Sequence, residues 1–346
     1  MSAVGAAFRV FKKRAAAWKG SGRSWSLYFV HGAEISMTFE DSFRGKVAIV
    51  TGGASGIGKA LGSALSRSGA IVTLIDKDEE ALLATVKELG NAVEGKTANV
   101  TDFESVKRLV DEVFAKYGKL DHLFNNAGTI IIGEVRDISI EDWREVIGVN
   151  LMGVVNGVAA AYPQMVRQKS GHIVNVASMV GLMPLGMQAA YTASKFGVVG
   201  LSHALRVEGR QLGVKVSVAC PPCVDTPIWT KAKVVGSTVR RPMGFVDLSP
   251  WWPKFLDADT EAEIILKGVR KNKATIEHDP AWHLMWWLYR LFPRLYLWVE
   301  DITVMKQARA VREKERDAGP GAGEALQGAE GVGAPAGELK EIAVAL

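Results

Sequence analysis

The chain of 346 residues has only two cysteines, Cys220 and Cys223. Two thiols cannot form the disulfide framework of a small secreted domain, and they cannot supply a four-cysteine zinc site. Their Cys-Pro-Pro-Cys spacing is that of a redox pair, but redox motifs of this type open a helix after a strand, whereas a proline-rich loop follows here. The sequence therefore predicts no metal site and favours a reducing, cytoplasmic compartment.

Outside residues 1–36 the chain has no net charge. The net charge of the chain is +5, and residues 1–36 already account for it. The charged side chains of this segment are Arg9, Lys12, Lys13, Arg14, Lys19, Arg23 and Glu34. Because the rest of the chain is neutral, it has no basic footprint for a nucleic acid, and we expect no nucleic-acid partner.

Residues 1–42 are predicted to be a basic extension in front of the folded domain. Phe8, Phe11, Ala15 and Trp18 would share one side of a helix whose other side is basic. Three interpretations stay open: a targeting presequence, a segment that lies on an anionic membrane, and an unfolded appendage. Met37 stands just ahead of the domain and is a second candidate start of the natural chain.

A glycine-rich turn at Val47–Gly58 is the element around which the rest of the chain is organised. A short apolar strand leads into the turn, which contains Gly52 and Gly56, and an Ala/Leu-rich helix follows it. Because glycine has no side chain, the backbone N–H groups of such a turn can approach a pyrophosphate. The phosphate would then lie at the N-terminus of the helix.

The next predicted strand, Ile71–Ile75, ends in Asp76, which lies about twenty residues past the last glycine of the turn. An acidic side chain at this place can accept both hydroxyls of an adenosine ribose. It favours NAD over NADP, because a 2′-phosphate would meet the carboxylate directly. The neighbouring Lys77 leaves some tolerance for NADP.

From Lys46 the chain alternates strands and helices at the pace of βαβ units, which predicts an α/β fold with a doubly wound parallel sheet, the Rossmann fold. The predicted strands are Val47–Val50, Ile71–Ile75, Gly95–Val100, Leu120–Phe124, His172–Ser178, Val214–Ala219 and Ala274–Glu277. The predicted helices are Lys59–Ser66, Glu79–Leu89, Phe103–Tyr117, Ile140–Ala161 with a cap near Ser139, and Ala262–Lys271 with a capping box at Thr260–Glu263. We expect these elements to form one nucleotide-binding domain over residues 43–278.

Five motifs in one order make the chain similar to the short-chain dehydrogenase/reductase superfamily, over roughly residues 43–277. They are the Thr-Gly-x-x-x-Gly-x-Gly turn at Thr51–Gly58, the Asn-Asn-Ala-Gly at Asn125–Gly128, Asn150 in a helix, Ser178 at a strand end, and Tyr191-Thr-Ala-Ser-Lys195. The resemblance implies hydride transfer between a secondary alcohol or ketone and a nicotinamide cofactor. It also implies a homo-oligomer, since the family is usually dimeric or tetrameric through helix faces.

Tyr191 is the candidate general acid and base. A free phenol, with a pKa of about 10, is a poor base at neutral pH. Lys195 lies four residues on, on the same helix face, and its ammonium group would favour the phenolate. Ser178 can hydrogen-bond the same substrate oxygen. The resemblance further implies that Lys195 reaches the nicotinamide ribose and that Asn150 holds a water between Lys195 and solvent; the alternative for Asn150 is a helix-packing amide.

The residues predicted to bind the cofactor lie in the glycine-rich turn, at strand ends, or in the motifs of the resemblance. They are Gly52, Ser55, Gly56, Ile57, Gly58, Asp76, Asn99, Val100, Asn126, Ala127, Gly128, Tyr191, Lys195, Val224 and Thr226. Two positions depart from the family pattern. Pro222 replaces a glycine, which reshapes the loop because proline fixes φ and has no N–H. Asn99 stands where an aspartate commonly meets the adenine amino group.

Residues 227–256 are rich in aromatic side chains and have no clear period. In the family this interval is the variable lid over the substrate. An aromatic lid favours an apolar, bulky substrate; the alternative is a loop that packs its aromatic side chains on the core.

An aromatic extension over residues 279–317 follows the domain, and it contains the longest apolar run, Trp282–Trp298. Pro293 and the arginines Arg290 and Arg294 lie near the middle of this run, which argues against a membrane-spanning helix. The composition is typical of a helix pair in a membrane interface, broken at the proline. Two alternatives stay open: a cap over the substrate cleft, and a contact with a second subunit. Residues 318–346 are predicted to be disordered.

Together these features predict an NAD-dependent oxidoreductase, with NADP use also open, that acts on a secondary alcohol or ketone in a lipophilic molecule such as a steroid, a retinoid-like or a fatty-acyl compound. Such an enzyme of lipid metabolism would be cytoplasmic, with peripheral membrane contact. One alternative is an NADP-preferring carbonyl reductase. The other is a membrane-attached nucleotide-binding protein without catalysis, against which the intact Ser178, Tyr191 and Lys195 argue.

Overall fold

The computed structural model describes residues 42–90, 92–236, 255–277 and 280–318, which all belong to one compact unit, Thr38–Leu346. The predicted basic extension up to residue 41, the middle of the predicted lid and the predicted C-terminal tail lie outside the described residues.

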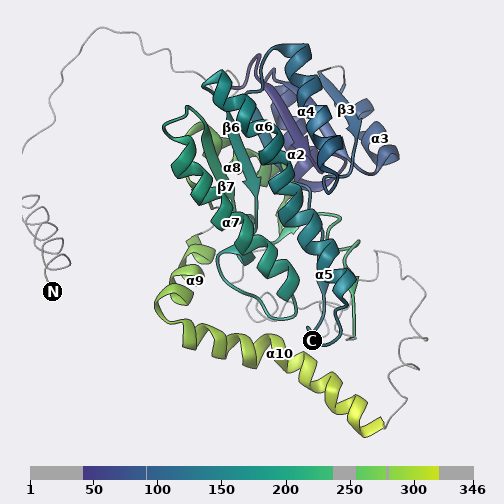
Figure 1. Ribbon diagram of the computed structural model, residues 1–346. Helices are drawn as coiled ribbons and strands as arrows, with labels where there is room; N and C mark the ends of the chain where they lie inside the picture. Colours follow the sequence, from purple (N-terminus) through teal and green to yellow (C-terminus); the bar gives the residue numbers. More distant parts are fainter. Residues whose placement is uncertain (1–41, 91, 237–254, 278–279, 319–346) are drawn as a thin grey trace, which may run out of the picture. The chain divides into compact units, whose positions relative to one another are not determined.

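A sheet of seven parallel strands forms the centre of this unit (Figure 1). In spatial order the strands are β11 (Thr275–Ile276), β7 (Lys215–Ala219), β6 (His172–Val176), β4 (His122–Asn125), β1 (Val47–Thr51), β2 (Ile71–Asp76) and β3 (Val93–Thr97). The chain order reverses between β1 and β4. In an open parallel sheet, the crevice beyond the carboxyl ends of the strands at this point is where ligands bind. The predicted doubly wound fold is confirmed.

Helices cover both faces of the sheet, as the alternation of elements predicts. They are α2 (Gly56–Arg67), α3 (Glu79–Leu89), α4 (Phe103–Tyr117), α5 (Ile140–Ile147), α6 (Gly153–Gln168), α7 (Ala189–Gly209) and α8 (Ala258–Arg270). The helices α2, α3 and α8 contribute to one buried apolar cluster with the strands, and α4, α6 and α7 contribute to a second cluster.

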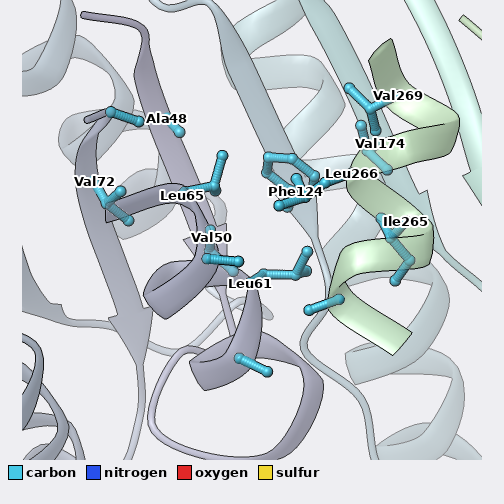
Figure 2. Close-up of a cluster of buried hydrophobic side chains, with 14 of the residues drawn as sticks. Ala48, Val50, Leu61, Leu65, Val72, Phe124, Val174, Ile265, Leu266 and Val269 are labelled. Atoms are coloured by element: carbon cyan, nitrogen blue, oxygen red, sulfur yellow. The ribbon is translucent and has the colours of Figure 1, made fainter. Parts of the chain in front are cut away.

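The central strands are buried on both faces, so their sequences are continuous apolar runs. All five residues of β1 are buried. Figure 2 shows Leu61 and Leu65 of α2 and Leu266 of α8 in one buried cluster with Val50 and Phe124. Full burial of an aliphatic side chain contributes about 1.5–3 kcal/mol relative to exposure. This packing holds β1, and with it the turn that follows β1, in a rigid layer.

The long helix predicted for Ile140–Ala161 is present, and it contains a π turn. Its start is as predicted, because Ser139 and Asp142 form a reciprocal capping box. A π-helical turn at Gly148–Met152 then separates α5 from α6, which continues to Gln168. A π turn inserts an extra residue into the helical period and often occurs at functional sites. The predicted long helix is therefore confirmed, and the π turn inside it is a feature that the sequence did not predict.

The start of α8 also differs from the prediction. The helix begins at Ala258, and its N-cap is Asp257, whose side chain accepts a hydrogen bond from the Thr260 amide at 2.8 Å. The predicted capping box at Thr260 is therefore wrong. Glu263 instead pairs with Lys267 one turn later, at 3.0 Å.

Short strands and a helix pair complete the described part of the chain. The strand β5 (Ile131–Ile132) pairs with β9 (Lys233–Val234), and β8 (Val224–Asp225) pairs with β10 (Leu256–Asp257). The helices α9 (Pro280–Leu291) and α10 (Pro293–Ala318) form the predicted pair, broken at Pro293. Among the described residues, Ile140–Gln168 is the one stretch long and apolar enough to cross a bilayer by length and composition, and it is a core helix of the fold.

Candidate active site

The turn between β1 and α2 leaves the first amides of α2 for a ligand. Ser55, the N-cap of α2, makes no capping hydrogen bond with its side chain within the described residues, and the first turn of α2 has no acidic residue. By contrast, the N-cap side chains of α3, α4, α5 and α8 each accept a backbone hydrogen bond, and each of these helices has acidic residues in its first turn. The N-terminus of α2 is therefore suited to an external anion such as a phosphate.

Glycine is required in this turn because other backbone atoms lie where a Cβ would be. Gly52 has a φ of +67°, and a Cβ there would lie 2.8 Å from the Cα of Ala127. A Cβ on Gly58 would lie 2.0 Å from the carbonyl oxygen of Gly52. Gly58 therefore supports the turn from behind and does not line the cavity that the described residues form.

The Asn-Asn-Ala-Gly segment is bonded directly to the same turn. The hydroxyl oxygen of Thr51 accepts hydrogen bonds from the amides of Asn126 at 3.0 Å and Ala127 at 3.1 Å. In return, the Asn126 side chain donates to the Thr51 carbonyl at 3.0 Å. Two motifs that are far apart in the sequence thus form one continuous floor at the switch point of the sheet.

Asp76 lies at the end of β2 with its carboxylate oriented by the backbone. One oxygen accepts a hydrogen bond from the Ala54 amide at 3.0 Å, and the other accepts one from the Asp78 amide at 3.1 Å. The side chain of Asp76 lines the cavity next to the glycine-rich turn. This is a suitable position for a carboxylate that accepts ribose hydroxyls.

One cavity of about 450 Å³ connects the glycine-rich turn with the predicted catalytic residues, and its volume is in the usual range for ligand pockets. The predicted site residues that line it are Gly52, Ser55, Gly56, Ile57, Asp76, Asn99, Val100, Asn126, Ala127, Gly128, Ser178, Tyr191, Lys195, Val224 and Thr226. Of the predicted set, Gly58 and Asn150 do not line the cavity that the described residues form.

Asn150 is fully buried in the π turn between α5 and α6. Its side-chain oxygen accepts a hydrogen bond from the Thr129 amide at 2.8 Å, and its amide nitrogen donates to the Thr129 carbonyl and to the Ser194 hydroxyl, each at 3.0 Å. These bonds tie the loop after β4 to α7. They agree with a positioning amide, and the water-holding role implied by the resemblance stays a prediction.

Ser178, Tyr191 and Lys195 meet at the carboxyl end of β6 and the start of α7. Ser178 lies two residues past the end of β6, and its hydroxyl oxygen accepts a hydrogen bond from the Val180 amide at 3.2 Å. The ammonium nitrogen of Lys195 lies 5.5 Å from the centre of the Tyr191 ring and donates to the Val176 carbonyl at 3.0 Å. Both Tyr191 and Lys195 are buried.

The pKa of Tyr191 shifts in the direction opposite to the one expected from Lys195. Burial raises it to about 12, with a hydrogen bond to Ser178 as a smaller, opposing effect. Burial also lowers the pKa of Lys195 to about 8. Both shifts have one cause, since a low-dielectric surrounding disfavours the charged form of each group. The expectation of a phenolate favoured by the spacing alone is therefore wrong for the chain itself.

Part of the cavity wall comes from residues that the sequence did not mark as site residues. Trp229, in the predicted lid, lines the cavity and donates from its indole nitrogen to the Val224 carbonyl at 2.9 Å. The helix pair contributes Trp282 and Met285 from α9, and Tyr296 and Glu300 from α10. From the sequence, a cap over the cleft was one of the alternatives for this segment. The available signal for Tyr296 and Glu300 was their spacing of four residues, which puts both on one face of a helix.

The loop after β7 brings Pro221, Pro222 and Cys223 to the cavity. Cys220 and Cys223 are free thiols. Burial raises the pKa of Cys223 to about 11 and the pKa of Cys220 further still. Redox motifs need a lowered thiol pKa. The redox interpretation of this Cys-Pro-Pro-Cys segment is therefore disfavoured.

A family model described as "short chain dehydrogenase" matches residues 46–234. The chain is 38% identical over 202 residues to D-threitol dehydrogenase of Mycolicibacterium smegmatis. These residues make up 58% of this chain and 78% of that protein. It is similar, with a TM-score of 0.66 and 32% identity, to a short-chain dehydrogenase/reductase from Burkholderia phymatum in complex with NAD, over 73% of this chain and 95% of that one. It is also similar, with a TM-score of 0.57 and 26% identity, to 3-ketoacyl-(acyl-carrier-protein) reductase from Brucella melitensis complexed with NADH, over 64% and 89% of the two chains.

Proposed function

Because this chain belongs to the short-chain dehydrogenase family and is an NAD(P)-dependent oxidoreductase, we propose that it interconverts a secondary alcohol and a ketone in a lipophilic molecule, with Tyr191 as general acid and base. The observation that carries the proposal is the single cavity that joins the glycine-rich turn to Ser178, Tyr191 and Lys195.

The residues around the turn fit a dinucleotide. The amides at the N-terminus of α2 suit its pyrophosphate, and the carboxylate of Asp76 suits the hydroxyls of its adenosine ribose. Val224 and Thr226 lie where the family holds the carboxamide, and both line the cavity. When bound, the nicotinamide supplies the hydride acceptor or donor.

Tyr191 moves the proton at the carbinol oxygen of the substrate. In ketone reduction the neutral phenol donates its proton to this oxygen and becomes a phenolate, and in alcohol oxidation the phenolate takes the proton from the alcohol. Burial keeps the phenol protonated at neutral pH, as its pKa of about 12 indicates, so Tyr191 is ready to act as a donor. Ser178 hydrogen-bonds Tyr191 and would hold the same oxygen of the substrate. Lys195 provides a cation close to the ring, which favours the phenolate when the proton has left.

The lipophilic substrate is supported by the many apolar residues in the wall of the cavity that also contains Ser178 and Tyr191. The apolar and aromatic residues of this wall are Val149, Met179, Met183, Leu185, Ile228, Trp229, Trp282, Met285 and Tyr296. A hydrophobic pocket of this kind favours a bulky apolar molecule over a small polyol such as the one in the name of the D-threitol dehydrogenase.

The substrate class can be tested with purified chain, oxidised cofactor and two probe alcohols. Cyclohexylcyclohexanol is a bulky apolar secondary alcohol, and D-threitol is a small polar one. We expect reduced nicotinamide to form faster with the apolar alcohol and with lipid extracts than with D-threitol and polar metabolite fractions. Turnover restricted to the polar set would contradict the lipophilic substrate, and the absence of turnover with every alcohol would contradict the dehydrogenase. Parallel runs with NAD and NADP compare the two cofactors.

We also propose that the helix pair makes peripheral contact with a lipid bilayer. The same two helices that line the cavity, together with Phe292 between them, also expose large apolar side chains: Leu284, Trp287, Leu291, Phe292, Leu295, Leu297 and Trp298. Arg290 and Arg294 are exposed among them. Exposed apolar residues mixed with tryptophan and arginine favour the interface of an anionic membrane, and an exposed patch of this kind calls for a partner. A lipophilic substrate would reach the cavity from the same surface.

Liposome sedimentation tests this contact. We expect the chain to partition onto vesicles that contain phosphatidylserine and expect the double variant Leu291→Ser, Trp298→Ser to remain in the supernatant. The matched control is Leu83→Ser, Val207→Ser, which changes two exposed apolar residues of α3 and α7. If the chain ignores vesicles but forms a dimer that the double variant cannot form, the face is a subunit interface and the membrane contact is wrong.

A further inference from the structure

A buried glutamine in the cavity wall has a side chain without a hydrogen-bond partner. Gln188 is the residue just before α7, and only 2% of it is exposed. Its backbone carbonyl accepts a hydrogen bond from the Thr192 amide at 2.7 Å, but its side-chain carboxamide makes no hydrogen bond within the described residues. A buried carboxamide is unfavourable unless it has polar partners, so this one indicates a place where a ligand binds.

The carboxamide of Gln188 faces the cavity that also contains Ser178 and Tyr191. Gln188 is not among the described residues whose unpartnered polar atoms are sealed from solvent. Because the residue as a whole is buried, the small accessible part of its carboxamide opens on the cavity that it lines. A ligand in this cavity can therefore reach the amide.

The backbone in front of Gln188 is held by distant segments. Met187 has a φ of +63°, in the left-handed region that a residue with a side chain rarely adopts. Its carbonyl accepts a hydrogen bond from the Gly133 amide at 2.8 Å, and its side chain is buried in an apolar cluster with Leu185 and Trp229. Such a backbone persists only where the surroundings enforce it, and it is common at ligand sites. The position of Gln188 is thus set before a ligand arrives.

The chemistry and place of the side chain determine what it can recognise. A carboxamide has no charge, offers two N–H donors and one acceptor oxygen, and therefore complements a neutral hydroxyl or carbonyl group. Gln188 precedes Tyr191 by three residues, which is roughly one helical turn. The group that it recognises must then lie close to the carbon that reacts at Tyr191. The wall around it includes the apolar side chains of Met183 and Leu185, so the rest of the ligand can be apolar.

We propose that Gln188 is a specificity-determining residue whose carboxamide hydrogen-bonds a second, neutral oxygen of the substrate. This oxygen is a hydroxyl or carbonyl group on the carbon next to the reacting carbon or one further along. The substrate class is then a lipophilic molecule with two neighbouring oxygen functions. This inference rests on the proposed function for the reacting oxygen, and it concerns the recognition of the second one.

Binding of three probes with one carbon skeleton tests this proposal. Cyclohexyl ethyl carbinol has one hydroxyl, and its two diols carry a second hydroxyl on the first or on the second carbon of the ethyl group. The chain is saturated with NADH, so that the alcohols bind without being oxidised, and binding is followed by titration calorimetry. We expect one diol to bind about fivefold more tightly than the carbinol, or better. In Gln188→Met, which has a similar size but no amide, this preference should disappear.

The stability of the variant separates recognition from a structural role. Gln188→Met removes no side-chain hydrogen bond of the described residues, so its midpoint of urea unfolding should not be lower than that of the unchanged chain. The matched control is Gln164→Met, because Gln164 of α6 pairs with Asp111 and does not line the cavity that the described residues form. It should keep the preference for the diol. Equal loss of affinity for all three probes in Gln188→Met, or no preference in the unchanged chain, would overturn the proposal.

Turnover of the same probes with NAD distinguishes this inference from the proposed function. If a diol binds preferentially through Gln188 but no probe is oxidised, the recognition holds and the dehydrogenase assignment fails. If all probes are oxidised and their KM values keep the same ratios in the unchanged chain and in Gln188→Met, the dehydrogenase stands and the role of Gln188 fails.

Discussion

Lys195 follows Tyr191 by one helical turn on α7, and its ammonium nitrogen lies 5.5 Å from the centre of the tyrosine ring. The two groups share one buried surrounding, which favours the neutral form of both: the pKa of Tyr191 is raised to about 12 and the pKa of Lys195 is lowered to about 8. Burial favours the neutral phenol of Tyr191, whereas a nearby ammonium group favours the phenolate. The ammonium group of Lys195 has this effect only while it keeps its proton. Ketone reduction needs the protonated phenol, which burial favours, and alcohol oxidation needs the phenolate, which the ammonium group favours.

Alcohol oxidation and ketone reduction should respond differently to pH. Oxidation needs Tyr191 to accept a proton, and a group with a pKa of about 12 is mostly protonated at neutral pH. The deprotonated fraction increases with pH below this pKa, so we expect kcat/KM for oxidation to rise between about pH 7 and pH 10. Reduction uses the protonated phenol and should stay level or fall. Initial rates in both directions across this interval check the prediction, and a rise in both would contradict it.

Tyr191→Phe should remove turnover while it preserves cofactor binding. The substitution deletes the hydroxyl that carries the proton, and general acid–base catalysis typically contributes 10²–10⁴-fold, so we expect a loss of about 10³-fold or more in kcat. Titration with NADH should give a Kd within about twofold of the unchanged chain. Tyr162→Phe is the matched control, because the Tyr162 hydroxyl is buried on α6 away from the cavity lining. Unchanged turnover in Tyr191→Phe would remove this residue from the mechanism.

Two glycine substitutions should have opposite effects. The Cβ of Gly58→Ala would lie 2.0 Å from the Gly52 carbonyl oxygen and 2.6 Å from the Asn126 amide nitrogen. The turn must shift, so we expect loss of NADH binding and destabilisation by about 1–3 kcal/mol. Gly200→Ala on α7 meets no heavy atom of the described residues within 4 Å and should stabilise the chain by about 0.5–1 kcal/mol. Urea denaturation and NADH titration of both variants measure these effects.

Asp76 should control the choice of cofactor. Its carboxylate is oriented by the amides of Ala54 and Asp78 and would repel a 2′-phosphate. We expect the unchanged chain to prefer NAD, and Asp76→Ser to shift the ratio of kcat/KM for NAD over NADP at least tenfold towards NADP, about 1.4 kcal/mol. Asp259→Ser, at an exposed aspartate of α8, should leave the ratio unchanged. A ratio that Asp76→Ser does not alter would assign the preference to another residue.

Glu261 should make stability depend on pH. Burial raises its pKa from 4.5 to about 8, so between these values the folded chain holds a proton that the unfolded chain has lost. Stability must therefore fall as pH rises through this interval. We expect Glu261→Gln to be more stable than the unchanged chain at pH 8.5, on the order of 1–3 kcal/mol, with the difference disappearing near pH 4.5.

Denaturant melts at both pH values measure this difference. Glu263→Gln provides the control, because Glu263 is exposed and pairs with Lys267 at the surface of the same helix. Such a pair contributes at most about 1 kcal/mol, so its loss should have a small effect. A gain in stability for Glu261→Gln that is equal at both pH values would contradict the assignment of the raised pKa.

Much of the nucleotide site was predictable because each part is local in the sequence. The turn at Thr51–Gly58 and the acid at Asp76 follow predicted strands, and the parallel fold brings strand ends to one edge. The π turn at Gly148–Met152 was not predictable, because the bonds of Asn150 to Thr129 and Ser194 that accompany it come from distant parts of the chain. The start of α8 was missed because Asp257 and Thr260 are both good caps, and only the backbone geometry distinguishes them.

The amino-acid sequence by itself determined the doubly wound fold and the glycine-rich turn, since these depend on periodicity and glycine conformation. Its resemblance to the family supplied the residues proposed for proton transfer. Tertiary structure alone decided two other matters. Burial, which is a property of the whole packed core, raised the pKa of Tyr191 against the expected effect of Lys195. Packing of α9 and α10 against the core brought Trp282 and Glu300 to the cavity, because a contact between segments distant in the chain leaves no local signal.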